Sequence, residues 1–326
     1  MGGDFAPAVE VAGAVECLRQ SNNRFHVVLV GDEQKINAEL QKHDGAGLDF
    51  SVVHAPEIID MHDSPVVAIK TKPNSSLVKG MTMHKERTVD AFVSTGNTGA
   101  VTAAATLILG RIPGVSRPAV AAIFPSEQGP TLIVDAGAVS DCRPQFLFEF
   151  GVMGSIYSEY MLQKKNPRVG LLNIGEEESK GNELAKETHK YISERKGKFN
   201  FAGNIEGRDI LKGKVDVVVC DGFVGNVLLK FAESIPGYLK FQFKKFAVKS
   251  LMNKLMIGML RGSLKEIFRD MDYTEFGGIP LLGVNGVTII GHGSSPSKAV
   301  KNMLFRAEET VQFKINQHIQ EKLQQQ

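Results

Sequence analysis

The chain has 326 residues, of which 43% are hydrophobic and 23% charged, and its formal net charge is only +2. These values are typical of a globular protein with one large domain or two lobes, and the near-neutral balance indicates no nucleic-acid partner. Cys17, Cys142 and Cys220 are widely spaced without a CxxC motif, which argues against a zinc knot or disulfide framework and fits a reducing cytoplasm. The first residues do not resemble a signal peptide, and no apolar run approaches the ~20 residues of a membrane span.

Short runs rich in Val and Ile alternate with helical patterns along the chain, which is typical of a mostly parallel sheet with crossover helices. The predicted strands are residues 25–30, 50–53, 89–94, 119–124, 131–134, 168–174, 215–220 and 287–290. The predicted helices are residues 9–21, 99–109, 145–164, 181–194, 226–243 and a long final helix, 297–321. The loops are short and no linker is evident, so we expect one α/β unit over residues 1–326, in two lobes around a cleft.

The stretch Ser94-Thr95-Gly96-Asn97-Thr98-Gly99-Ala100 connects a predicted strand to a predicted helix. Its glycines allow close backbone approach, its hydroxyls and amides can donate hydrogen bonds, and the helix start adds positive charge. These properties favour an anion site, although a capped turn without a ligand fits the heptapeptide equally well.

Three more predicted strands end in small or polar residues, in motifs that include Asp135, Asn173 and Asp221. Ligands of open α/β sheets bind beyond the carboxyl ends of the strands, so these ends favour a shared active-site cleft. In the motif that follows Asn173, Lys180 can neutralise a phosphate or an oxyanion. Residues 176–178 are three glutamates, which could bind a metal, but we prefer the interpretation that they favour a helix start in solvent.

Two further polar residues follow predicted strands. Asn226 could cap the helix that follows it or direct its amide at a reacting carbonyl, and the pattern favours neither role. His292 lies in a Gly-rich loop that opens the last helix. The chain has no G-x-S-x-G, HExxH or G-x-G-x-x-G motif, which argues against a serine hydrolase of that type, a zinc protease and a Rossmann dehydrogenase.

The segment of about residues 239–269 is rich in Lys and Arg, and Glu266 is its only acid. Its apolar residues recur at helical spacing, and the basic residues lie largely outside that stripe. Such a helix can contact an anionic membrane or an acidic protein, and an ordinary core or dimer-interface helix pair fits equally well. The candidate contact residues are Lys249, Leu251, Lys254, Leu255 and Met259.

Together these motifs resemble the fatty acyl carrier protein:phosphate acyltransferases of bacterial phospholipid synthesis. The matching pieces are MGGDFAP, STGNTGA, DAGAVSDCRP, LLNIGEEESKGNE, GNIEGRDI, VVVCDGFVGNVLLK, YTEFGGIPLLGVNG and GHGSSPSKAVKN. They follow one another in order over almost the whole chain. Two features depart from the family: it usually has a strand before the MGGD turn at which this chain begins, and it typically has Asn where this chain has Val139.

The resemblance implies a three-layer α/β/α sandwich similar to phosphotransacetylase and isocitrate dehydrogenase-like enzymes. It implies a cytoplasmic homodimer that associates peripherally with anionic membranes and moves a long-chain acyl group from acyl carrier protein to inorganic phosphate. A glycerol-3-phosphate acyltransferase would then be a downstream partner. The alternatives are a short-chain phosphotransacylase that uses coenzyme A and, less favoured, a decarboxylating dehydrogenase.

In this scheme phosphate is the nucleophile, so we expect no metal and no cofactor. Lys180 orients and neutralises phosphate, and Asn226 donates to the oxyanion, as the resemblance implies for these two positions. The predicted phosphate-binding residues are Ser94, Thr95, Gly96, Asn97, Thr98 and Gly99. The other predicted cleft residues are Asp4, Asp135, Asn173, Glu176, Asp221 and His292.

Overall fold

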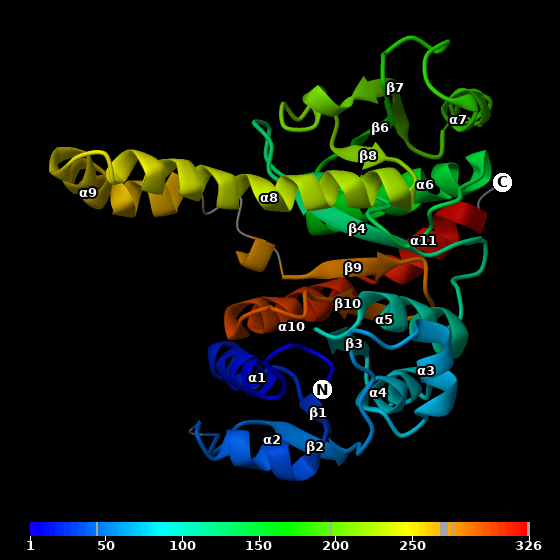
Figure 1. The fold of residues 1–326 in the computed structure, drawn as a ribbon. Helices are drawn as coiled ribbons and strands as arrows, with labels where there is room; N and C mark the ends of the chain where they lie inside the picture. The colour runs from blue at the N-terminus through cyan, green and yellow to red at the C-terminus, as the bar shows by residue number, and fades with distance from the viewer. Residues whose placement is uncertain (44, 196, 268–272, 276, 325–326) are drawn as a thin grey trace.

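The computed structural model describes residues 1–326 except 44, 196, 268–272, 276 and 325–326. An eight-stranded sheet forms its centre, with the strand order β3-β10-β9-β4-β5-β8-β6-β7 (Figure 1). The strands are β3 (Ala91–Ser94), β4 (Ala119–Phe124), β5 (Thr131–Val134), β6 (Arg168–Asn173), β7 (Asn200–Glu206), β8 (Val217–Val219), β9 (Ile279–Leu282) and β10 (Val287–Ile290). A second, parallel sheet contains β1 (Val27–Gly31) and β2 (Phe50–His54).

Helices surround the sheet, as Figure 1 shows. They are α1 (Ala8–Ser21), α2 (Glu33–Leu40), α3 (Pro65–Thr71), α4 (Ser76–Lys85), α5 (Thr98–Ala104), α6 (Pro144–Met161), α7 (Glu183–Ser193), α8 (Gly222–Ala247), α9 (Leu251–Ile267), α10 (Ser297–Gln312) and α11 (Ile315–Gln324). A π-helical turn, Ala105–Leu109, continues α5, and 3-10 turns occupy Gly207–Asp209 and Tyr273–Glu275.

The core is split between the two faces of the large sheet. Successive side chains of a strand point to opposite faces. On β5 and β8, Ile133 and Val218 therefore belong to one hydrophobic cluster, with α4 and α5, while Leu132 and Val217 belong to another, with α6 and α11. This arrangement confirms the predicted α/β fold with helices on both sides of the sheet.

The direction of the strands changes across the large sheet. Its β3/β10, β5/β8, β8/β6 and β6/β7 pairs are parallel, and the three pairs that join β10, β9, β4 and β5 are antiparallel. The sheet is therefore mostly parallel, as predicted. The three reversals make β3 and β10 run opposite to β5, β8 and β6. The carboxyl ends of β3 and β10 consequently lie at the opposite edge of the sheet from those of β5, β8 and β6, so polar residues at these strand ends are separated.

Every predicted strand and helix has a counterpart, but several elements were missed. The elements not predicted from the sequence are α2, α3, α4, β7 and β9. The prediction of a single final helix was wrong. The helix is interrupted between α10 and α11, where Lys314 adopts a left-handed φ of 50°. The predicted helix from residue 226 begins earlier, at Gly222, and extends to Ala247.

Helices α8 and α9 form a hairpin that projects from the body at the left of Figure 1. The predicted basic segment covers the end of α8 and all of α9, and its last two positions, 268 and 269, lie outside the described residues. Among the described helices, none combines the length and apolar character needed to cross a bilayer.

Candidate active site along helix α8

Asp135 directly follows β5 and organises the loop at that strand end. Its side chain is fully buried and accepts hydrogen bonds from the backbone N–H groups of Val120, Gly137, Ala138 and Val139, at 2.7–3.0 Å. Burial raises the pKa of Asp135, and these backbone donors act in the opposite direction. Because the carboxylate is surrounded by backbone donors, Asp135 serves as an anchor for the loop rather than as an exposed reactive group.

The first turn of α8 packs directly on this anchored loop. A Cβ added to Gly225 would lie 1.8 Å from the backbone oxygen of Asp135, so only glycine allows this approach. Asp221 is the N-cap of α8 and accepts a 2.9 Å hydrogen bond from the N–H of Val224. The capping role considered for Asn226 is therefore wrong. The Asn226 side chain instead lies against Gly137, where an added Cβ would be 2.9 Å from its Nδ2.

The loop after β6 folds back on Asn173. The Asn173 amide donates to the backbone oxygen of Lys180 at 3.0 Å, and its Oδ1 accepts from the N–H of Ile174. Gly181 adopts a left-handed φ of 92° beside this amide, where a side chain would collide with it. The Lys180 side chain is exposed, and no ion pair ties its ammonium group to another described residue. The loop thus fixes the backbone of Lys180 and leaves its charge accessible.

The three glutamates of this loop do not form a metal site with other residues in the part of the chain that the structure describes. Glu176 pairs with Lys214 at 2.6 Å, and Glu178 lies 4.0 Å from His189. All three glutamates are exposed, as predicted, but α7 begins at Glu183, so they precede its first turn and the predicted role at the helix start falls to Glu183 instead.

The turn after β3 uses most of its own side chains. Thr95 donates to Glu10 at 2.5 Å, and the Ser94 hydroxyl accepts from the N–H of Gly96. Asn97 caps α5 by accepting from Ala100 and donates to backbone oxygens of residues 60, 61 and 63. An anion at this turn would therefore rely chiefly on the exposed Thr98 and Gly99.

His292 follows β10, beside the turn after β3, where the N–H of Gly291 donates to the backbone oxygen of Ser94. Its Nε2 lies 3.2 Å from Glu233 of α8, and Glu233 also pairs with Lys230 at 2.9 Å. Burial lowers the pKa of His292, while the charge of Glu233 acts in the opposite direction. Asp4 reaches this cluster too, since its N–H donates to the backbone oxygen of Gly293 at 2.9 Å.

The predicted residues therefore form two groups. One contains Asp135, Asn173, Lys180, Asp221 and Asn226, at the ends of the adjacent strands β5, β8 and β6. The other contains Asp4, the turn of residues 94–99 and His292, at the ends of β3 and β10.

Helix α8 connects the two groups. Asn226 lies in its first turns and Glu233 about 10 Å further along its axis, at 1.5 Å per residue. A shared cleft would have to follow α8 rather than one edge of the sheet. Glu233, Lys230 and Glu10 were not predicted from the sequence, because no local motif marks them and the contacts of Glu233 and Glu10 join distant segments.

The comparisons with known proteins agree with this architecture. The family model described as "Fatty acid synthesis protein" matches residues 1–318. The chain belongs to this family. Phosphate acyltransferase of Chlorobaculum parvum is 48% identical over 98% of this chain and 96% of its own length. Phosphate acyltransferase of Pelobacter propionicus is 46% identical over 99% of this chain and 92% of its own length.

Solved structures support the predicted fold of this family member. EutD phosphotransacetylase from Staphylococcus aureus superposes with a TM-score of 0.55 at 15% identity, over 92% of this chain and 99% of that one. A phosphotransacetylase from Streptococcus pyogenes gives a TM-score of 0.56 at 16% identity, over 96% of this chain and 92% of that one. The likeness confirms the predicted phosphotransacetylase-like architecture.

Proposed function

We propose that this chain transfers a long-chain fatty acyl group from an acyl carrier protein thioester to inorganic phosphate, giving an acyl phosphate. Its membership of the fatty acid synthesis protein family and its phosphate acyltransferase relatives support this activity. The observation that carries the proposal is the pair Lys180 and Asn226. Both side chains are exposed on rigidly held backbone at adjacent strand ends, and neither is tied to another described residue by a hydrogen bond or ion pair.

The two side chains suit acyl transfer to phosphate. A phosphate oxygen attacks the thioester carbon, the carbon–sulfur bond breaks, and the carrier leaves as a thiolate that takes a proton from solvent. The Lys180 ammonium offsets the negative charge of phosphate, and the Asn226 amide donates to the carbonyl oxygen as it becomes an oxyanion. Losing one such donor lowers the rate by about 10²–10³-fold. No nucleophile from the protein takes part in this scheme.

Residues 94–99 belong to the same proposal as a phosphate-binding turn, through the exposed Thr98 and Gly99. Asp4 and His292 would line the other end of a cleft along α8. The acyl phosphate would pass to an acyltransferase that esterifies glycerol 3-phosphate in phospholipid synthesis.

The direct test measures acyl phosphate, trapped as hydroxamate, from long-chain acyl carrier protein and phosphate. We expect product with the unmodified chain and a loss of at least about 100-fold in Lys180→Ala. Lys186→Ala is the matched control, because Lys186 is an exposed lysine on the neighbouring helix α7. Near-normal turnover in Lys180→Ala, with the same melting temperature, would contradict the proposed role of this residue.

A short-chain phosphotransacylase is the second candidate function. The structural likeness to two phosphotransacetylases favours it, since coenzyme A and carrier-protein thioesters present the same reacting atoms. Acetyl-coenzyme A in a parallel assay separates the two: product from this substrate alone would favour the second candidate.

We include in this proposal that the chain forms a homodimer, which the exposed apolar side chains of helix α8 support. Large apolar side chains lie exposed along most of the length of α8: Phe223, Val227, Phe231, Tyr238 and Phe241. A contiguous exposed stripe of this kind is typical of a protein interface. We expect Phe231→Glu to shift the protein toward the monomer in analytical ultracentrifugation, and an unchanged mass would count against this interface.

The turn between α8 and α9 and the first half of α9 support contact with an anionic membrane. Leu251 and Met259 are 74% and 77% exposed, and Lys249 and Lys254 lie exposed among them. Apolar side chains beside lysines favour binding to anionic lipid. Leu255→Glu with Met259→Glu should release the protein from anionic liposomes, whereas Leu211→Glu, an exposed leucine outside the hairpin, should not. Equal binding of both variants would contradict the membrane proposal.

A further inference from the structure

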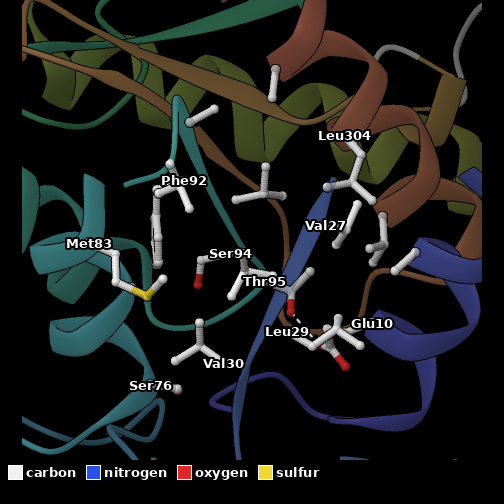
Figure 2. A pocket seen from close by; sticks show the side chains of 18 of the residues that line it. Glu10, Val27, Leu29, Val30, Ser76, Met83, Phe92, Ser94, Thr95 and Leu304 are labelled. Carbon is white, nitrogen blue, oxygen red and sulfur yellow. Dashed lines mark hydrogen bonds between the residues drawn. The ribbon is translucent and has the colours of Figure 1, made fainter. Parts of the chain in front are cut away.

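Two polar side chains, each with a buried oxygen that lacks a partner, hold turns of the proposed cleft. Figure 2 shows Glu10 of α1, which accepts from Thr95 through Oε1 beside a cavity of about 510 Å³. Asn204 of β7 is 4% exposed and donates through Nδ2 to the backbone oxygen of Glu177 at 3.0 Å, in the loop after β6. Glu10 Oε2 and Asn204 Oδ1 have no hydrogen-bond partner among the described residues. Because a buried polar atom without a partner costs stability, each of these residues calls for an explanation beyond stability.

A bulge in β7 directs Asn204 toward the loop after β6. Leu171 of β6 pairs with Asn204, and two residues of β7, 202 and 203, lie opposite residue 170 alone. Gly203 has the left-handed φ of 86° that one common class of bulge requires. Without the extra residue, position 203 would lie beside Leu171, and the Asn204 side chain would point to the other face of the sheet. The bulge therefore brings the amide to the face from which it reaches the loop.

The backbone oxygen of Glu177 links Asn204 to Lys180. That oxygen accepts from Asn204 Nδ2 at 3.0 Å and from the N–H of Lys180 at 3.1 Å. Asn173 fixes the other side of the lysine by donating to its backbone oxygen at 3.0 Å. The first carbons of the Lys180 side chain lie over Gly175, where an added Cβ would be 2.9 Å from Lys180 Cγ. The backbone of Lys180 and the start of its side chain are therefore fixed, and Asn204 supports one of these contacts.

Two other contacts hold this loop, and both involve exposed side chains. Glu176 pairs with Lys214 at 2.6 Å, and both residues of this pair are exposed to solvent. Glu178 lies 4.0 Å from His189, but 82% of the Glu178 side chain is exposed. Ion pairs at the surface contribute little, because water and salt screen them. The hydrogen bond of Asn204 comes from a buried side chain, so it is better able to fix the loop in one place.

We propose that Asn204 is a positioning residue for the Lys180 ammonium group, an inference that rests on the proposed function. Asn204 is buried beneath the loop, and its amide bonds to the loop backbone. It holds the Glu177 oxygen to which the Lys180 amide donates, so the lysine side chain begins from a fixed backbone position. A displacement of about 1 Å in a positioned group can lower a rate by about 100-fold. One buried hydrogen bond can therefore affect the rate more strongly than it affects stability.

A purely structural role is the competing interpretation, since Asn204 also joins the loop to β7. The two roles predict different results once the Lys180 side chain is removed. A residue that acts through Lys180 then has nothing left to position. A residue that only stabilises the fold lowers activity by the same factor with or without the ammonium group. The interaction between the two substitutions therefore separates the two roles.

The test measures hydroxamate formation in Asn204→Ala, in Lys180→Ala and in the variant with both substitutions. We expect Asn204→Ala alone to lower kcat/KM for phosphate by about 10–100-fold. Added to Lys180→Ala, it should lower this value by less than about twofold. Asn200→Ala is the matched control, because Asn200 lies on the same strand and donates through Nδ2 to the backbone oxygen of Asn166 at 3.2 Å. Equal losses with and without the Lys180 side chain, or a similar loss in Asn200→Ala, would overturn the proposal.

Hydrogen exchange adds a readout that does not depend on turnover. Asn204→Ala should speed exchange of the Lys180 amide by at least about fivefold, while the amides of β8 keep their exchange rates. An unchanged Lys180 amide would overturn the proposal. Normal turnover in Lys180→Ala would instead contradict the proposed function, and faster exchange of the Lys180 amide would still support the hold of Asn204 on this residue. If Asn204→Ala does not fold, Asn204→Ser replaces it in both measurements, because its shorter side chain leaves the Glu177 oxygen without the amide donor.

Discussion

The loops after β5 and β6 differ from the turn after β3 in which residues hold the backbone and which residues present free polar groups. In the first region, Asp135 and Asn173 hold the backbone, and different residues, Asn226 and Lys180, present free polar groups. In the turn after β3, Thr95 and Asn97 are themselves the residues that hold the turn together. A polar motif at a strand end therefore identifies a structured loop, but only the contacts show which of its polar groups remain free to bind.

The largest expected effect is on catalysis at the first region. Asn226→Ala should lower kcat by about 10²–10³-fold, because one donor to the oxyanion is lost. Its melting temperature should change little, since Asp221 rather than Asn226 caps α8. Hydroxamate kinetics and thermal unfolding measure the two effects. A large fall in melting temperature would contradict the claim that Asn226 acts in catalysis and does not hold the fold together.

Asp135→Asn should show the opposite pattern. One carboxylate oxygen becomes an NH₂ group that faces backbone donors, so we expect a loss of about 3 kcal/mol in the free energy of unfolding. Asp141→Asn, an exposed carboxylate in the same loop, should change it by less than about 0.5 kcal/mol. Urea titration measures both, and similar values for the two variants would argue against the anchoring role of Asp135.

A smaller effect is expected in the turn after β3. Asn97→Ala removes the N-cap of α5 and the hydrogen bonds to the loop of residues 60–63, which should cost about 2 kcal/mol of stability. Asn182→Ala removes a similar N-cap from α7, at about 1 kcal/mol. Chemical unfolding of the two variants isolates the contribution of the loop contacts. If Asn97→Ala lost phosphate turnover without any loss of stability, the contrast between the two regions would fail.

The smallest expected effect is on pH dependence. Burial lowers the pKa of His292 below the ordinary value of about 6.5, so the unfolded chain binds a proton there more readily than the folded chain. Stability should therefore fall as the pH drops through about 6.5 toward the lower folded pKa. His292→Gln should flatten this part of the profile in unfolding measured at pH 7.5 and 5.5. An equal fall in both proteins would contradict the contribution of His292 to this pH dependence.

The sequence predicted the class of fold because its strongest signals are local. The Val- and Ile-rich runs correspond to the central strands, and the order of motifs identified the family that the comparisons confirm. β7 and β9 were missed for physical reasons: β7 mixes polar and apolar residues and contains Gly203, and β9 contains Pro280 and directly follows two glycines. The break before α11 depends on the left-handed Lys314, which no sequence pattern marks.

The site was predicted less completely, because its geometry depends on contacts between distant segments. The sequence marked Asp135 as a polar strand end, but the donation from Val120 comes from the neighbouring strand. It suggested one cleft at the strand ends, whereas the antiparallel middle of the sheet separates these ends into two groups. The roles of Lys180 and Asn226 stay predictions that the kinetic experiments test.

Helix α8 also acts as a spacer of fixed length. From Asn226 to its last residue, Ala247, it advances about 32 Å at 1.5 Å per residue. If the end of α8 rested on a lipid surface with the helix axis along the membrane normal, the proposed reacting group Asn226 would stand at about that distance from the surface. The proposed carrier protein would then reach the site from the aqueous side, and the proposed acyl phosphate would have to cross the same distance to reach the bilayer.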